Sequence, residues 1–290
     1  MTASALRALL ASDRVTHVPG VYDPVTAALA VAAGNRAVHL SGAAVSATML
    51  GRPDLGFVPA TQIADRASTL VPALRGIPLL ADADTGYGNP LHAVWTGLAY
   101  SRAGVSGLHL ADRVSPERGG HPAGKGVIAT TPAAATIQAL ADQVPELVVI
   151  ARTDAYAVNG LADTIERCRA YAEAGAGAVL PAGVVELAEL EELHRALPGV
   201  PLVVDRSEAA PHQPTWTDAD LAAVGVRLAL HPVAALLAAM RAASVTYRAI
   251  AESGDATAVE RMPWAAFTAL GGPDEARDPD ARYVPRGLQT

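Results

Sequence analysis

The sequence has little of several features that define other classes of protein. It contains one cysteine, Cys168, in 290 residues, so no disulfide can form within the chain. Aromatic residues make up only 4% of the composition, which argues against an aromatic-centred β-sandwich. The abundance of Ala, Val, Leu and Gly instead suits helices that pack on a parallel sheet. These features favour an α/β fold.

Positive charge is also scarce. The 22 Lys and Arg residues form no run and the formal net charge is -7, so we expect no nucleic-acid partner. The first ten residues lack the charged start and long apolar stretch of a secretion signal, so we expect a cytoplasmic location. The most apolar region, Ala222 to Ala243, is interrupted by Arg227 and Arg241. It predicts a buried strand followed by a helix, and no membrane partner.

Short aliphatic runs recur along the chain, and an amphipathic segment follows each one. The runs predict eight strands, at Val15–Pro19, Ala37–Ser41, Ile77–Asp82, Gly107–Asp112, Leu147–Thr153, Ala178–Pro181, Val200–Asp205 and Val226–Leu230. The predicted helices lie near Pro24–Ala33, Ala60–Leu74, Pro90–Ala103, Pro132–Gln143, Gly160–Ala174, Val185–Ala196, Thr217–Val224 and Pro232–Ser253. Eight such pairs indicate a TIM-type (β/α)8 barrel, since no Gly-x-Gly-x-x-Gly follows the first strand to favour an open doubly wound sheet.

The composition fits one large domain. With 51% hydrophobic residues the chain can bury a sizeable core, and we assign residues 1–253 to the barrel domain. Residues 254–290 form a C-terminal helical extension, in which four prolines rule out one long helix and only Met262–Leu270 is predicted to be helical. This extension either packs on a neighbouring subunit or lies as a plain surface arm.

Polar residues follow the predicted strands at their carboxyl ends, where a parallel barrel carries its functional side chains. Asp82 and Asp84 point the same way from one strand end, and two such carboxylates repel unless a cation joins them. We predict a Mg²⁺ site here, with Asp54 acting through water and Asp112 as a further candidate ligand. The alternative is that Asp82 and Asp84 cap the next helix or bond the glycine-rich turn.

Arg152 closes an apolar strand, so its guanidinium is expected to enter the open end of the barrel. Its planar fork can grip a carboxylate or phosphonate with two hydrogen bonds. The alternative is a structural ion pair with Asp154 or Asp112.

The segment 117–125 is rich in glycine and cations, including Arg118 and Lys125. It resembles a lid that closes over an anion, with His121 as a possible acid or base, and the alternative is an ordinary solvated loop. His39 and His109 lie within strands and are expected to be satisfied barrel residues. Cys168 is expected to pack as a small apolar residue.

Several motifs occur in order between about Pro19 and Met240. They are Pro19-Gly20-x-Tyr22-Asp23, Leu40-Ser41-Gly42, Gly51-x-Pro53-Asp54-Leu55-Gly56, Asp82 to Gly88, His121 with Gly124-Lys125, Ile150 to Ala155, and Tyr171-x-Glu173-Ala174-Gly175-Ala176. Through these motifs the chain resembles the superfamily of isocitrate lyase and phosphoenolpyruvate mutase, which includes 2-methylisocitrate lyase and the carboxyphosphonoenolpyruvate mutases.

The resemblance implies roles for several residues. Asp82 would bind Mg²⁺ directly, with Asp84 and Asp54 acting through water. Ser41, Gly42 and Arg152 would hold the carboxylate and oxo group of the substrate, with Asp82, Arg118 and Lys125 also in the substrate-binding set. Tyr22 and His121 are the candidate acid or base groups. Relatives exchange a carboxyl-terminal helix between subunits, so the resemblance also implies a homo-oligomer, a dimer or tetramer.

The sequence departs from the family pattern at three positions. Gly119 stands where the lyases carry a catalytic Cys, so acid catalysis by a thiol is excluded there. Ala111 replaces an acidic residue that supports the water shell of the metal, and Ala182 stands in the segment where a Glu is expected after the sixth strand. We therefore do not expect a standard isocitrate or methylisocitrate lyase.

The expected function is that of a Mg²⁺-dependent lyase or mutase. It would act on a C–C or P–C bond next to a 2-oxo or 2-hydroxy carboxylate through an enolate-like intermediate. The substrate would be a small anionic carboxylate or phosphonate, and a substrate of unusual structure from a specialised biosynthetic route would explain the altered residues. The alternatives are a 2-oxo acid hydrolase or decarboxylase, and a catalytically silent barrel that binds a small acid.

Overall fold

Eight parallel strands close into a barrel in the computed structural model, which describes residues 2–114, 126–209 and 214–270. The strands follow one another around the barrel in chain order. They are β1 Thr16–Val21, β2 Val38–Leu40, β3 Leu79–Asp82, β4 Gly107–Ala111, β5 Val148–Thr153, β6 Ala178–Pro181, β7 Leu202–Asp205 and β8 Val226–His231. The predicted TIM-type (β/α)8 barrel is confirmed, with every predicted strand in place.

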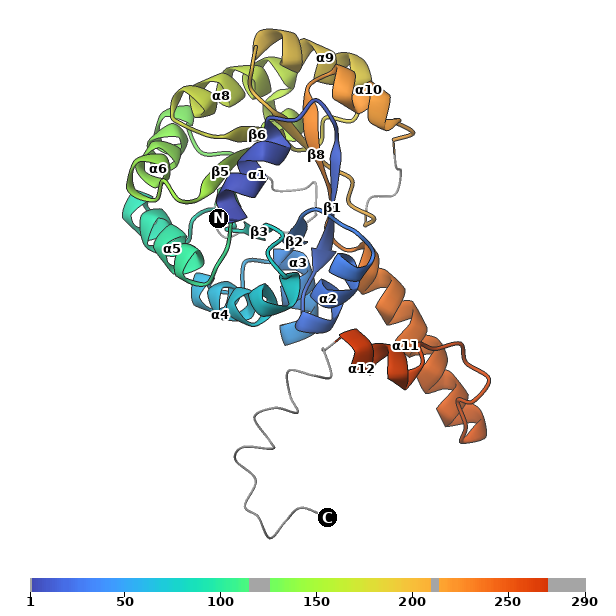
Figure 1. Ribbon diagram of the computed structural model, residues 1–290. Helices are drawn as coiled ribbons and strands as arrows, with labels where there is room; N and C mark the ends of the chain where they lie inside the picture. The colour runs from blue at the N-terminus through green and yellow to red at the C-terminus, as the bar shows by residue number, and fades with distance from the viewer. Residues whose placement is uncertain (1, 115–125, 210–213, 271–290) are drawn as a thin grey trace. The chain divides into compact units, whose positions relative to one another are not determined.

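Helices alternate with the strands around the barrel (Figure 1). Those that the sequence predicts are α2 Pro24–Ala32, α4 Ala60–Leu70, α5 Pro90–Arg102, α6 Thr130–Gln143, α8 Leu161–Glu173, α9 Leu187–Ala196, α10 Asp218–Ala223, α11 Ala234–Ser253 and α12 Trp264–Leu270. Three short helices and one 3₁₀ turn were not predicted as separate elements: α1 Thr2–Leu10, α3 Gly42–Leu50, α7 Tyr156–Asn159 and η1 Val71–Leu74. The α3 segment is apolar almost throughout and has no helical period, so sequence pattern alone does not identify it.

An Ala-Gly pair ends each of three helices, α2, α5 and α8. Gly34, Gly104 and Gly175 have φ angles of 85°, 87° and 99°, in the region that glycine enters at little cost. Each turns the chain from a helix into the next strand.

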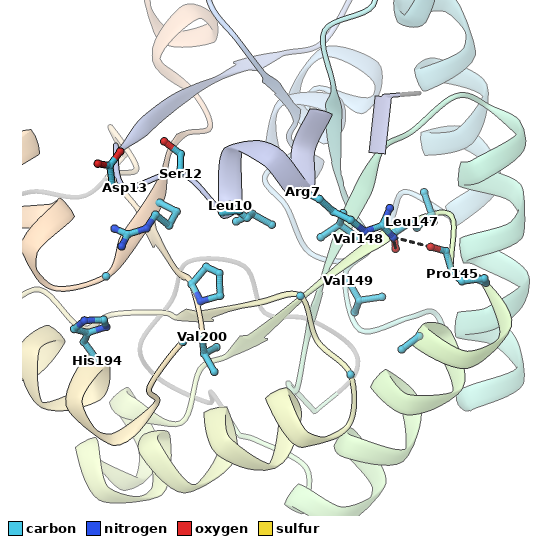
Figure 2. Close-up of a pocket in the computed structure, with 18 residues that line it drawn as sticks. Arg7, Leu10, Ser12, Asp13, Pro145, Leu147, Val148, Val149, His194 and Val200 are labelled. Atoms are coloured by element: carbon cyan, nitrogen blue, oxygen red, sulfur yellow. Dashed lines mark hydrogen bonds between the residues drawn. The ribbon is translucent and has the colours of Figure 1, made fainter. Parts of the chain in front are cut away.

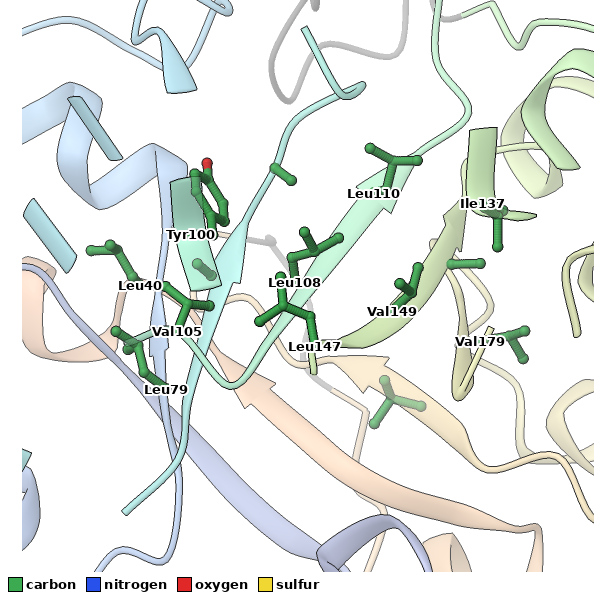
Figure 3. Close-up of a cluster of buried hydrophobic side chains, with 14 of the residues drawn as sticks. Leu40, Leu79, Tyr100, Val105, Leu108, Leu110, Ile137, Leu147, Val149 and Val179 are labelled. Atoms are coloured by element: carbon green, nitrogen blue, oxygen red, sulfur yellow. The ribbon is translucent and has the colours of Figure 1, made fainter. Parts of the chain in front are cut away.

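Buried apolar side chains form two main groups. An outer cluster lies between the strands and the helices and includes Leu40, Leu108, Val149 and Ile137, as Figure 3 shows. An interior cluster lies within the barrel and contains Leu80, Ile150, Val203 and Leu230, among others. Residues of a strand alternate between the two clusters, because successive side chains point to opposite faces.

Two further features concern particular segments. Leu6, Leu9 and Leu10 of α1 belong to the interior cluster, so α1 covers the end of the barrel at the amino ends of the strands. Cys168 is fully buried in the outer cluster, and burial raises the pKa of its thiol, which agrees with the expected packing role.

By its internal contacts the chain divides into two units, Met1–Leu237 and Ala238–Thr290. The domain boundary at 253/254 stays a prediction. Within the described residues, no helix is both long enough and apolar enough to cross a membrane.

Candidate active site

Three carboxylates approach one another at the carboxyl end of β3. Asp82 is the last residue of β3, and its Oδ1 accepts a hydrogen bond of 2.9 Å from the backbone N–H of Asp84. Its Oδ2 accepts one of 3.3 Å from the N–H of Gly42, at the start of α3. Asp84 and Tyr87, in the loop that follows, have φ angles of 50° and 60°. Non-glycine residues rarely adopt such angles, and strain of this kind concentrates at functional sites.

Asp54 completes this group. A Cβ atom at Gly42 would lie 2.7 Å from Asp82 Oδ2 and 3.5 Å from Asp54 Oδ2, so both carboxylates face Gly42. A cavity of about 10 Å³, roughly the room for one water, lies between them and is also lined by Asp84 and Tyr87. We call Asp54, Asp82 and Asp84 the carboxylate group.

The charge of Asp82 raises the pKa of its two neighbours. Burial, followed by the charges of Asp82 and Asp84, raises the pKa of Asp54 to about 6. Burial and the charge of Asp82 raise the pKa of Asp84 to about 6 as well. Burial also opposes the charge on Asp82, but the nearby imidazoles of His109 and His39 and the Asp84 amide outweigh it and lower the pKa of Asp82. Among the residues that the structure describes, the charges of Arg113 and Arg152 oppose the rise at Asp84 without overcoming it.

The donor set fits a hard divalent cation. All of its side-chain donors are carboxylate oxygens, which Mg²⁺ prefers, and Asp84 Oδ1 is buried without a hydrogen-bond partner. In residues 2–114, 126–209 and 214–270, no three His, Cys, Asp or Glu side chains converge closely enough to form a complete metal site. A Mg²⁺ ion bound here would take most of its ligands from water or substrate.

Arg152 and Arg113 both bind the carboxylate of Asp154. Arg113 donates to Asp154 from Nε at 2.7 Å and from Nη2 at 3.1 Å, and Arg152 donates from Nε at 3.2 Å. Burial opposes the charge on Asp154, but the two guanidinium groups outweigh it and hold the pKa of Asp154 below its usual range. The ion pair between Arg152 and Asp154 that the sequence left as an alternative is therefore present. Arg152 also keeps 18% of its side chain exposed at the end of β5, where a bound anion can still reach it.

Asp112 does not join the carboxylate group. Its Oδ2 accepts hydrogen bonds from Thr153 Oγ1 at 2.7 Å, Tyr171 OH at 2.7 Å and Arg167 Nη1 at 3.1 Å. Its Oδ1 accepts one of 3.0 Å from the N–H of Asp154. Four donors occupy this buried carboxylate, so we withdraw it from the candidate metal ligands and assign it a structural role.

Two buried histidines lie below the carboxylate group. The Nε2 atoms of His39 and His109 are 2.9 Å apart, and His109 Nδ1 lies 3.6 Å from Asp82 Oδ1. Burial lowers the pKa of His39 to about 3 and also lowers that of His109. The expectation that both rings are satisfied is wrong in one respect, because the Nδ1 atom of each is buried without a hydrogen-bond partner.

The remaining predicted site residues have different surroundings. The Ser41 hydroxyl accepts a bond of 3.4 Å from the N–H of Ala44 and caps α3. Tyr22 is 8% exposed and packs with Ala44, Val233 and Leu236, and burial raises the pKa of its hydroxyl. Arg118, His121 and Lys125 lie outside the described residues.

The sequence reasoning missed three charged residues near the carboxyl ends of the strands. Arg113 follows directly after Asp112. Its position just after a predicted strand could have identified it as a candidate site residue. Asp205 ends β7 and is exposed, and it also ends a predicted strand, so the same signal applies. Glu208 lies in the loop beyond β7 and accepts bonds from His231 Nδ1 at 2.9 Å and the Val233 N–H at 3.3 Å. No local sequence signal identifies Glu208, because both of its partners lie more than twenty residues away along the chain.

A larger cavity, of about 760 Å³, opens at the other end of the barrel (Figure 2). It lies between α1 and the loops that precede β5 to β8, and its lining includes Arg7, Val148, His194 and Val200. Arg7 donates from Nη2 to the carbonyl oxygen of Pro145 at 2.6 Å. The lining contains one acidic residue and no group like the three carboxylates. Because active sites of this fold lie at the carboxyl ends of the strands, the smaller cavity marks the candidate active site.

Comparisons with known proteins identify a family and several similar proteins. A family model described as phosphoenolpyruvate phosphomutase matches residues 6–251. The chain is similar to 2,3-dimethylmalate lyase of Eubacterium barkeri, with 31% identity over 288 residues that cover 98% of each protein. It is similar to the structure of oxaloacetate acetylhydrolase in complex with 3,3-difluorooxalacetate, with a TM-score of 0.90, 31% identity and coverage of 97% and 96%. A structure of phosphonopyruvate hydrolase with oxalate and Mg²⁺ is similar at a TM-score of 0.85 and 28% identity, covering 98% of this chain and all of that one.

Proposed function

The chain belongs to the phosphoenolpyruvate phosphomutase family, within the isocitrate lyase and phosphoenolpyruvate mutase superfamily, and on that basis we propose its reaction. We propose that it is a Mg²⁺-dependent enzyme that breaks or forms a C–C or P–C bond next to a 2-oxo or 2-hydroxy carboxylate. The reaction passes through an enolate-like intermediate. The substrate is a small carboxylate or phosphonate.

The observation that carries this proposal is the carboxylate group around Gly42. Two of its three members have a pKa raised to about 6 by burial and by their neighbours' charges, so the group is costly to hold ionised without a cation. Asp82 would hold the ion directly, with Asp84 and Asp54 bonding its waters. When bound, Mg²⁺ supplies positive charge that stabilises the negative charge developing on the substrate oxygen atoms.

The protein residues have separate tasks in this scheme. Arg152 binds the substrate carboxylate through its remaining N–H groups, while Asp154, itself bound by Arg113, holds the Arg152 guanidinium in place. The Gly42 N–H fixes the carboxylate of Asp82, and Ser41 caps the helix that carries Gly42. Arg118, His121 and Lys125 remain proposed contacts from the segment after β4, and Tyr22 remains a proposed acid or base.

The test is calorimetric titration of the metal-free protein with Mg²⁺, alone and with oxalate as an enolate mimic. We expect oxalate to tighten Mg²⁺ binding, and Asp82→Ala to abolish both binding events while the circular dichroism spectrum is unchanged. A wild-type protein that binds neither probe would rule out the proposed function and favour the silent binding barrel.

A hydrolase is the second candidate, because two of the proteins with similar structures are hydrolases by name, oxaloacetate acetylhydrolase and phosphonopyruvate hydrolase. It differs from a lyase or mutase in that water ends up in the products. Product analysis by NMR after incubation with oxaloacetate and with phosphonopyruvate separates the two. Gly119 and Ala111, in place of the Cys and the acid of the lyases, support our proposal that the enzyme is not a standard methylisocitrate lyase.

We also propose a homo-oligomer. Helices α11 and α12 expose large apolar side chains, among them Met240, Tyr247, Ile250 and Trp264. Large apolar side chains exposed in this way are typical of helices that bury them against another subunit. Light scattering coupled to gel filtration should give a dimer or tetramer for the wild type and a smaller species for Met240→Asp.

A further inference from the structure

Asp205 lies in the same layer of the barrel as the residues proposed to bind metal and substrate. Side chains two residues apart on a strand point to the same face. Asp82, Arg152 and Asp205 each follow, by two residues, a member of the interior cluster: Leu80, Ile150 and Val203. All three side chains therefore point inward, from the carboxyl ends of β3, β5 and β7.

Alternate strands of such a barrel supply one layer of side chains. β3, β5 and β7 are alternate strands, so Asp82, Arg152 and Asp205 belong to one layer, at the carboxyl ends of the strands. Their charges act on one another, since Arg152 lowers the pKa of Asp205 and Asp205 raises that of Arg152. Asp205 thus faces the space in which a substrate held by Asp82 and Arg152 would lie.

The other acidic groups that the structure describes near Asp205 are already engaged. Asp154 binds two guanidinium groups, and Asp112 accepts four hydrogen bonds. Glu208 uses both of its oxygen atoms, on His231 and on the Val233 amide. Asp205 differs from these acids. Its side chain forms no hydrogen bond or ion pair with another residue that the structure describes.

The electrostatic surroundings favour a proton on Asp205. Surrounding protein atoms raise its pKa by desolvation, and Glu208, Asp154 and Asp82 raise it further, while Arg152 opposes them. The side chain is nevertheless exposed at the open end of the barrel, so water can exchange its proton. A carboxyl group that is both accessible and readily protonated suits general acid–base catalysis.

We propose that Asp205 is the catalytic residue that moves the proton between solvent and the substrate carbon next to the 2-oxo group. This inference rests on the proposed function, and it assigns the role that no thiol can fill at Gly119. In the cleavage direction, the O–H bond of the Asp205 carboxyl group breaks and a C–H bond forms from the electron pair of the enolate. Asp205 is left as a carboxylate, which takes a proton from water.

The reverse step gives a test that needs no knowledge of the natural substrate. With pyruvate as a minimal 2-oxo acid, the Asp205 carboxylate removes a methyl proton and the C–H electron pair moves into the enolate. In D₂O the proton on Asp205 is replaced by deuterium, which returns to the carbon. The rate of this exchange is followed by ¹H NMR in the presence of Mg²⁺, and oxalate binding is measured separately by calorimetry.

We expect the wild type to exchange the methyl protons and Asp205→Asn to lower the rate at least about 100-fold, with oxalate affinity changed by less than about threefold. Asp205→Glu should restore part of the rate, because it keeps the carboxyl group. Asp65→Asn, the same change on the exposed surface of α4, should exchange at the wild-type rate.

The remaining outcomes separate the two proposals. If the wild type binds Mg²⁺ and oxalate but exchanges no protons, or if Asp205→Asn exchanges at the wild-type rate, the role of Asp205 is refuted and the proposed function stands. If Asp205→Asn loses oxalate binding together with exchange, Asp205 binds or positions the ligand and does not carry the proton. If the wild type binds neither Mg²⁺ nor oxalate, the proposed function itself fails.

Discussion

The backbone N–H of Gly42 donates to Oδ2 of Asp82 over 3.3 Å, and this bond joins the start of α3 to the end of β3. The two residues are forty positions apart in the sequence. Because Gly42 has no side chain, its backbone can approach the carboxylate that we propose as the direct ligand of Mg²⁺.

Gly42→Ala should therefore damage the metal site and leave the fold intact. The added Cβ would lie 2.7 Å from Asp82 Oδ2 and 3.2 Å from its Cγ, so the carboxylate must turn away. We expect affinity for Mg²⁺ with oxalate to fall at least about tenfold, while helix content holds because alanine favours helix. Gly97→Ala in α5, where the new Cβ lies 2.8 Å from Leu140 Cδ2, is the matched control and should keep full affinity. Equal affinities in the two variants would contradict the proposed role of Gly42.

Mg²⁺ affinity should depend on pH near 6. Asp54 and Asp84 have pKa values raised to about 6, and each must be ionised to support the cation. We expect affinity to fall as the pH drops below 6, by up to about tenfold per pH unit for each carboxyl group that takes up a proton. Calorimetry from pH 5 to pH 8 measures the slope, and Asp54→Asn should make it shallower. A slope unchanged in that variant would exclude Asp54 from the site.

The stability of the metal-free protein should change in the opposite direction. In the folded state Asp54 and Asp84 hold their protons up to about pH 6, above the ordinary value of 3.8 that applies to the unfolded chain. Their contribution to stability is therefore fully present below pH 3.8 and is lost as the pH rises through 6. Thermal unfolding with EDTA should show that Asp84→Asn reduces this loss between pH 4 and pH 6.5. If the variant instead loses more stability over this pH range, then protonation of Asp84 does not stabilise the folded state.

Asp112→Ala should destabilise the fold. The change leaves the buried Arg167 guanidinium and the Thr153 and Tyr171 hydroxyls without their shared acceptor. Removing one partner of a buried ion pair costs about 3–5 kcal/mol, which urea unfolding would detect. Glu191→Ala breaks an exposed pair with Arg195 and should cost no more than about 1 kcal/mol. Similar losses of stability in both variants would show that the hydrogen bonds of Asp112 stabilise the fold no more than an exposed ion pair does.

Arg152→Lys should separate substrate binding from metal binding. Lysine keeps the charge but cannot form two parallel hydrogen bonds to a carboxylate. It also loses the hydrogen bond from Arg152 Nε to Asp154 that orients the guanidinium. We expect oxalate affinity to fall about 10- to 100-fold while Mg²⁺ binding without oxalate changes little. Arg195→Lys on the surface of α9 serves as the control. Unchanged oxalate affinity would mean that Arg152 serves only its ion pair with Asp154.

The sequence by itself determined the architecture. Aliphatic runs that alternate with amphipathic segments predicted all eight strands, because a parallel strand buried on both faces must be apolar along its length. The same reasoning placed Asp82, Asp84, Asp54 and Arg152 near the open end of the barrel, since polar residues that follow such runs meet there. Helix α3 was not predicted, because its sequence is apolar almost throughout and has no helical period.

Only the tertiary structure decided how the charges are paired. Asp112 and Asp84 look alike in the sequence, yet Asp112 meets Arg167 and Tyr171, which lie more than fifty residues further along the chain, while Asp84 keeps a buried oxygen without a partner. Asp205 likewise ends a strand as Asp82 does, but its place beside Arg152 follows from closure of the barrel and the layering of alternate strands. Local sequence sets the direction in which a side chain points, whereas its partners come from segments that only folding brings together.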